Sequence, residues 1–105
     1  MKPGEKRRLE KAGWRVGTAA EFLNLSPEEE ALVNMRLALA GAVRGRRARL
    51  GFSQSELARR LGSSQSRVAK IEAAESNVSF DLLVRALLAT GAKPRDVGQA
   101  IAAGK

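Results

Sequence analysis

Apolar residues recur at three- and four-residue spacing along most of the chain, a pattern typical of amphipathic helices. The longest apolar stripe is formed by Leu32, Met35, Leu39 and Val43. Just before it, Ser26 can cap a helix and Pro27 suits the first helical position. We therefore predict a helix from Pro27 to about Leu50 that stops at Gly51.

A short helix follows within the segment FSQSELARRLG. Ser53 and Glu56 stand three residues apart, which is the spacing of a capping box. Leu57, Ala58 and Leu61 are its inward positions, and Gly62 suits a terminus where a positive φ is wanted.

Three further helices are predicted downstream. The first is capped by Ser63 or Ser64, has Val68 and Ile71 inward, and ends before a break at residues 75–77. The second is capped by Ser79, ends at Gly91, and has an apolar side made of Leu82, Leu83, Ala86, Leu87 and Leu88. The third opens at Lys93-Pro94, turns Val97 and Ile101 inward and precedes Gly104. No segment alternates as a strand does, so the predicted fold class is all-α.

The N-terminal residues have a different character. Residues 1–12 carry mostly charged side chains and are read as a basic arm that contacts DNA phosphates or is only solvated. Thr18 and Glu21 have capping-box spacing and predict a short helix to about Leu25. We therefore expect a basic arm and short helix over residues 1–26, and one domain over residues 27–105.

The net charge of the chain indicates the class of partner that it binds. Nineteen basic and eleven acidic residues give a formal net charge of +8, which favours a polyanion, with nucleic acid ahead of an acidic membrane. A generally basic protein without such a partner is the alternative. No apolar run approaches the roughly 20 residues that span a bilayer, and no secretory signal is recognisable, so we expect a cytoplasmic protein.

The amino-acid composition gives little support for catalysis or for metal binding. The chain contains no cysteine and no histidine, which removes thiolate ligands, the usual proton shuttle and the commonest transition-metal ligand. Glu28, Glu29 and Glu30 are consecutive and so fan around a helix instead of converging on a metal. We therefore expect no enzyme activity, no metal, no cofactor and no small-molecule ligand.

Four arginines gather at the end of the long predicted helix. Cations suit a helix C-terminus, so the group can be explained structurally. Four in six residues exceed what a cap needs, and a guanidinium fits a phosphate well. We therefore predict phosphate contacts from Arg44, Arg46, Arg47 and Arg49.

The segment from Gln54 to Glu72 predicts a helix-turn-helix. Two helices joined by a turn of three or four residues can place the second in a groove while the first braces it. Ala58 is small enough for close approach of the helices, and Gly62 permits the turn. With Val68 and Ile71 inward, the outer surface of the second helix holds Gln65, Ser66, Arg67 and Lys70.

The stretch SQSELARRLGSSQSRVAKIEAAESNVSFDLLVRALLATG resembles the XRE (Cro/C1-type) helix-turn-helix family. The resemblance covers about residues 35–100 and implies a five-helix, lambda-repressor-like domain. The upstream stretch GWRVGTAAEFLNLSPEEEALVNMRLALA is similar to the leader of short HigA-type antitoxins, although a Trp-Gly leader carries no chemistry of its own.

The family resemblance implies a role for each matching residue. Gln54 would contact the DNA backbone or an outer base, and Ser64 with nearby backbone amides would hold a phosphate. Gln65 and Ser66 would meet base edges, since glutamine pairs bidentately with adenine. Two longer side chains would reach guanine or a phosphate, namely Arg67 and Lys70.

One departure from the family concerns the loop after Glu72, a residue expected to fix that loop. Family members often have basic residues there, whereas this loop reads AAESNVS and includes Glu75. Loop contacts to phosphate are therefore in doubt, and the backbone role shifts to residues 44–49 and to Arg59 and Arg60. Both arginines could equally form a solvated helix face.

The sequence is compatible with three functions. The first is a transcriptional regulator, an autorepressor that binds an inverted-repeat duplex DNA as a homodimer through Val97, Ile101 and the small residues of the last helix, or through the N-terminal leader. The second is a HigA-type antitoxin that neutralises a RelE/HigB-like toxin protein and represses the shared operon. The third, an RNA-binding or nuclease-like enzyme, lacks histidine and a convergent carboxylate pair.

Overall fold

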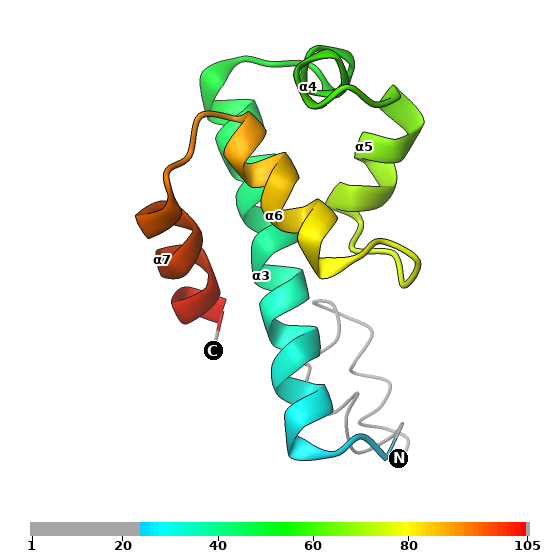
Figure 1. Ribbon diagram of the computed structural model, residues 1–105, viewed down its shortest axis with the longest axis vertical. Helices are drawn as coiled ribbons and strands as arrows, with labels where there is room; N and C mark the ends of the chain where they lie inside the picture. Colours follow the sequence, from blue (N-terminus) through cyan, green and yellow to red (C-terminus); the bar gives the residue numbers. More distant parts are fainter. Residues whose placement is uncertain (1–23, 105) are drawn as a thin grey trace, which may run out of the picture. The chain divides into compact units, whose positions relative to one another are not determined.

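The computed structural model describes residues 24–104, and in this range every regular element is an α-helix. The helices are α3 (Pro27–Leu50), α4 (Gln54–Leu61), α5 (Gln65–Glu72), α6 (Phe80–Ala89) and α7 (Pro94–Gly104) (Figure 1). The all-α, five-helix prediction is thereby confirmed. The predicted basic arm and the short helix from Thr18 lie outside the described residues, except for positions 24 and 25, which are not helical.

The chain divides into two compact units within α3, after Asn34. The described part of the first unit contains the start of this helix. The backbone N–H of Ser26 donates to Glu29 Oε1 at 2.8 Å, and the N–H of Glu29 donates to Ser26 Oγ at 3.1 Å. This reciprocal cap satisfies two amides that the first helical turn leaves without partners, and Pro27 follows it as predicted.

Glycine and serine set the boundaries of the two short helices in the second unit. α3 ends before Gly51, whose φ is +80°, and α4 ends before Gly62, whose φ is +73°. Both angles lie in the left-handed region that residues with a Cβ avoid. The hydroxyl of Ser53 caps α4 by accepting from the Glu56 amide, and that of Ser64 caps α5 by accepting from the Arg67 amide.

The core of the second unit is aliphatic and draws on four helices. The largest fully buried side chains are Leu39, Val43, Leu57, Val68, Ile71, Leu83 and Leu87. α6 packs against α4, α5 and α7, and so holds the short helices together. Leu88, which was placed on the apolar side of α6, is instead 40% exposed, because it follows the buried Leu87 around the helix.

α7 differs from the other helices because none of its residues is fully buried. Its first turn is closed by a hydrogen bond from the Lys93 amide to Asp96 Oδ2 at 2.8 Å. Val97 and Ile101 are partly buried against the core, in agreement with their predicted inward positions. Gly104 is the last residue of this helix, whereas the sequence placed it just beyond the end.

Candidate nucleic-acid interface

The connection between α4 and α5 consists of residues 62–64. The left-handed Gly62 turns the chain, and the next amide, that of Ser63, donates back to Ala58 O at 2.8 Å. Ala58 is buried where the two helices meet, and its small side chain lets them pack closely. The turn is therefore rigid, and the direction of α5 follows from that of α4.

The two sides of α5 are sharply different. Val68 and Ile71 have no exposed surface, so this side anchors the helix in the core. The opposite side is polar and exposed, and it contains all four residues predicted to read bases, Gln65, Ser66, Arg67 and Lys70. The predicted recognition surface is thus accessible to a macromolecule.

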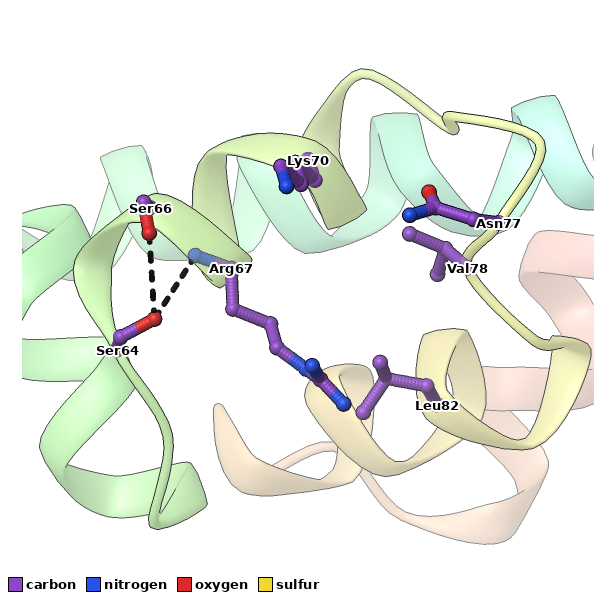
Figure 2. Close-up of a pocket in the computed structure, with 7 residues that line it drawn as sticks. All are labelled: Ser64, Ser66, Arg67, Lys70, Asn77, Val78 and Leu82. Atoms are coloured by element: carbon purple, nitrogen blue, oxygen red, sulfur yellow. Dashed lines mark hydrogen bonds between the residues drawn. The ribbon is translucent and has the colours of Figure 1, made fainter.

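An open pocket of about 150 Å³ lies beside the recognition surface (Figure 2). Ser64, Ser66, Arg67 and Lys70 line it from α5 and its cap, and Leu82 lines it from α6. Asn77 and Val78 complete it from the loop between these helices. Asn77 is not predictable as a site residue, because nothing in the loop composition indicates which of its polar residues turns towards α5.

Ser64 organises the start of α5. Its Oγ accepts from the Arg67 amide at 3.1 Å and lies 3.3 Å from the hydroxyl of Ser66 (Figure 2). One amide of the first turn is therefore already used by the cap. The remaining amides, together with the positive end of the helix dipole, suit an anion at this terminus.

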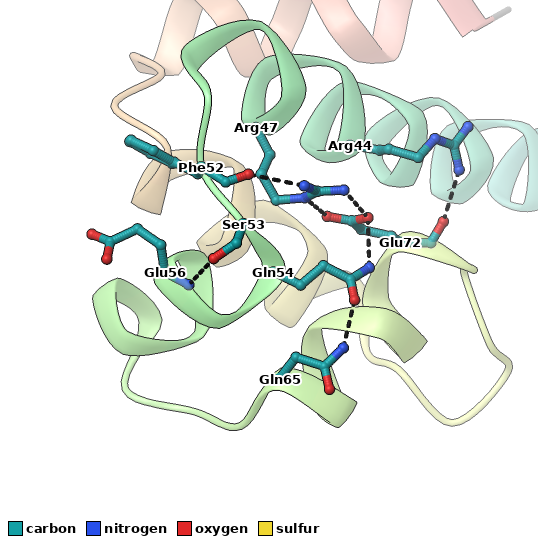
Figure 3. A network of polar contacts seen from close by, with 8 residues as sticks. All are labelled: Arg44, Arg47, Phe52, Ser53, Gln54, Glu56, Gln65 and Glu72. Atoms are coloured by element: carbon teal, nitrogen blue, oxygen red, sulfur yellow. Dashed lines mark hydrogen bonds and ion pairs between the residues drawn. The ribbon is translucent and has the colours of Figure 1, made fainter.

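A polar network lies behind the recognition surface and joins α3, α4 and α5 (Figure 3). Gln65 Nε2 donates to Gln54 Oε1 at 2.6 Å, and Gln54 Nε2 donates to Glu72 Oε1 at 3.1 Å. Arg47 donates to the same carboxylate through Nε at 2.5 Å and Nη2 at 3.0 Å. Glu72 is thus the shared acceptor of residues from two other helices.

Burial and charge act in opposite directions on Glu72. Desolvation raises its pKa, but hydrogen bonds from Arg47 and Gln54 and the positive charges of Arg47 and Arg44 outweigh it, so the pKa is lowered. The same hydrogen bond raises the pKa of Arg47. Both groups are therefore charged, as a buried ion pair requires.

The four arginines at the end of α3 have different environments. The side chain of Arg47 is 17% exposed, and its Nη1 also donates to Phe52 O at 2.9 Å. Arg46 Nε donates to Thr90 Oγ1 at 3.0 Å, and Arg44 Nη1 reaches Glu72 O at 3.4 Å. The side chain of Arg49 is exposed and donates no hydrogen bond to another described residue. Three of these guanidinium groups thus bond to residues outside α3, but only Arg47 uses three of its N–H groups in this way.

The outer face of α4 also carries paired charges. Glu56 accepts from Arg59 Nη2 at 2.5 Å and from Arg60 Nε at 3.0 Å, and hydrogen bonds from these two residues lower its pKa. The capping box predicted here is only half formed, because the Glu56 carboxylate faces these arginines instead of the Ser53 amide. Arg60 also lies over the Phe52 ring, 4.1 Å from its centroid.

Within residues 24–104, no group of three or more His, Cys, Asp or Glu side chains could hold a metal ion. None of the helices α3 to α7 combines the length and apolar character that crossing a bilayer requires.

Two short helices joined by a tight turn, the second with a buried side and an exposed polar side, define a helix-turn-helix domain. A family model described as helix-turn-helix matches residues 43–97, more than half of the 105-residue chain. The chain therefore belongs to this helix-turn-helix family, a family of DNA-binding regulatory domains of the XRE type that its sequence resembles. No curated protein and no solved structure matches the chain significantly.

Proposed function

We propose that this protein is a sequence-specific DNA-binding transcriptional regulator that inserts α5 into the major groove. The observation that carries the proposal is the exposure of Gln65, Ser66, Arg67 and Lys70 on a helix whose other side is locked in the core. An α-helix fits the major groove, where each base pair presents a distinct pattern of donors and acceptors.

The exposed residues divide into two roles under this proposal. Gln65, Ser66, Arg67 and Lys70 read base edges. Phosphates are held by Ser64 with the first amides of α5 and by arginines at the end of α3. Gln54 was also expected to contact the DNA backbone, but both ends of its amide are engaged by Gln65 and Glu72, so we assign it to the scaffold. Among these arginines we assign backbone contacts to Arg44, Arg46 and Arg49. Arg47 is assigned to the scaffold, because a phosphate contact would compete with its bonds to Glu72.

One recognition helix spans only a few base pairs, which favours a two-fold dimer on an inverted repeat with half-sites about one helical turn apart. We propose that the homodimer seam involves α7, where Val97 and Ile101 are only partly buried and Gly98, Ala102 and Ala103 are exposed. Residues 27–105 would then form the DNA-binding domain, with residues 1–26 as a basic arm. Repression of the protein's own gene is the simplest regulatory use.

The antitoxin function is the alternative within the same DNA-binding scheme. It rests on the leader sequence, most of which lies outside the described residues. A RelE/HigB-like reading frame beside the gene, and a complex of the two purified proteins, would favour it. A protein that binds its operator but has no such neighbour is a stand-alone regulator.

The experiment that tests the proposal is selection of bound sites from random-sequence duplex DNA by the purified full chain. The expected result is an inverted-repeat consensus. Recovery of sequences no different from the starting pool would refute sequence-specific binding. A consensus without two-fold symmetry would refute only the homodimer.

A further inference from the structure

The hydrogen bonds behind the recognition surface all converge on the Glu72 carboxylate. Gln65 donates to Gln54, Gln54 donates to Glu72, and Arg47 donates to Glu72 from the other side (Figure 3). We call Gln65, Gln54 and Glu72 the relay. In each glutamine of the relay, the amide nitrogen points towards Glu72 and the amide oxygen points away from it.

Glu72 dictates this direction. An ionised carboxylate has no hydrogen to give and can only accept. The lowered pKa of Glu72 keeps the carboxylate in this form. Gln54 must therefore turn its NH₂ towards Glu72, which leaves Gln54 Oε1 facing Gln65.

The orientation of the Gln54 amide in turn fixes that of Gln65. Gln65 must turn its NH₂ towards Gln54, and one N–H is used in this bond. Its Oε1 and second N–H remain available on an exposed side chain. One acceptor beside one donor is the complement of adenine, which offers N7 as an acceptor and N6 as a donor in the major groove.

We propose that Glu72 is a positioning residue for base specificity: through Gln54 it fixes which end of the Gln65 amide faces DNA, and thereby selects adenine over guanine. The inference rests on the proposed function, since it needs α5 in the major groove. The inference goes further because it assigns base specificity to Glu72, whose side chain is only 5% exposed.

The relay can be reversed by one substitution. In Glu72→Gln, the guanidinium of Arg47 is still only a donor, and its shorter bond, from Nε at 2.5 Å, keeps the oxygen of the new amide at the Oε2 position while the bond from Nη2 is lost. The NH₂ of that amide then faces Gln54, which must turn over to offer Oε1. Gln65 turns over in response, gives Oε1 to Gln54 and presents both N–H groups to DNA. Two donors complement guanine, which offers N7 and O6 as acceptors.

The experiment is site selection from random-sequence duplex DNA with full-length variants. Gln65→Ala first identifies the base position that Gln65 faces, as the position whose preference is lost. At that position the unaltered chain is expected to favour adenine, and Glu72→Gln to favour guanine. Each preference is expected to be about 5- to 150-fold, the range for one bidentate contact. Glu28→Gln is the control, because it removes an equal charge from an exposed position outside the helix-turn-helix.

A second variant keeps the inference testable if Glu72→Gln does not fold. Gln54→Met interrupts the relay but leaves the Arg47–Glu72 pair in place. Gln65 can then present either end of its amide, so the preference between adenine and guanine is expected to fall to nearly one. A merely structural role for Gln54 would lower affinity for all sites and leave this ratio unchanged.

Failure of the proposed function and failure of this inference alone would give different results. Recovery of no consensus by the unaltered chain would refute the proposed function itself. A consensus in which Gln65→Ala loses no base, or in which the base facing Gln65 is guanine, would overturn the inference alone. The same holds if folded Glu72→Gln still selects adenine, or if Gln54→Met keeps the original ratio.

Discussion

Arg47 and Glu72 lie 25 residues apart in the sequence and form a two-point ion pair between α3 and α5. The guanidinium gives Nε and Nη2 to the two carboxylate oxygens, at 2.5 and 3.0 Å. The two side chains are 17% and 5% exposed. Such a pair fixes geometry more than it adds stability, because desolvation offsets much of the attraction.

Although the pair adds little net stability, removal of one partner is costly, so Arg47→Ala is expected to destabilise the fold strongly. It would leave the Glu72 carboxylate buried without its main partner, a situation that costs about 3–5 kcal/mol. The measurement is the free energy of unfolding in denaturant. Arg49→Ala, an exposed arginine two residues on, is the control and should change this free energy by no more than about 0.5 kcal/mol. Equal effects from both variants would contradict the scaffold role of Arg47.

Acid should weaken the fold through Glu72. Its pKa is lowered, so its stabilising contribution is complete above the ordinary value of 4.5 and is lost as the pH falls through the native pKa. The free energy of unfolding measured from pH 7 to pH 3 is therefore expected to decline below about pH 4.5. Glu56 and Asp96 also have lowered pKa values and contribute to this decline. Glu72→Gln should make it shallower, and an unchanged slope would contradict the assignment.

The turn between α4 and α5 offers a test of backbone strain. Gly62 has a φ of +73°, and nothing lies within 4 Å of a Cβ built there. Gly62→Ala should thus destabilise through conformation alone, by roughly 1–2 kcal/mol. Gly62→Asn should cost less, because asparagine tolerates the left-handed region better. The order of the two thermal midpoints checks the prediction, and a larger loss for asparagine would contradict it.

Base reading and phosphate binding should respond differently to salt. Gln65→Ala is expected to lower affinity for the selected site by about 1–3 kcal/mol and to leave the salt dependence unchanged. Arg49→Ala is expected to weaken binding to all sequences alike and to reduce the slope of log K against log salt by about 1. Titrations at several salt concentrations on specific and random duplexes distinguish them. If the two variants behaved alike, the division into base and phosphate contacts would be incorrect.

The helices were largely predictable because their ends carry local signals. Ser53, Gly62 and Ser64 act on amides and carbonyls within a few residues, so their roles can be read from the neighbouring sequence. The exposed side of α5 was also predictable, since Val68 and Ile71 fix the inward direction. These features depend on helical periodicity and capping, which need no knowledge of the rest of the fold.

The polar network was not predicted, because it depends on how separate helices are placed. The arginines of α3 were interpreted as phosphate contacts, whereas Arg46 and Arg47 reach partners 44 and 25 residues away. A signal was nevertheless present. Arg47 continues the buried stripe of Leu39 and Val43, and Glu72 follows Val68 and Ile71 at inward spacing. Opposite charges at core-facing positions of two helices indicate a pair.

The contacts that hold α5 in place differ in whether they depend on pH. Its C-terminal end and the next loop are held by neutral carbonyls, which accept from Arg44 at Glu72 O and from Arg36 at Glu75 O. Guanidinium groups stay protonated throughout the accessible pH range, so these attachments do not titrate. The side-chain bonds of Glu72 to Arg47 and Gln54 depend instead on a carboxylate. Acidification would therefore release these two bonds, while the carbonyl contacts of Arg44 and Arg36 keep the C-terminal end of α5 tethered.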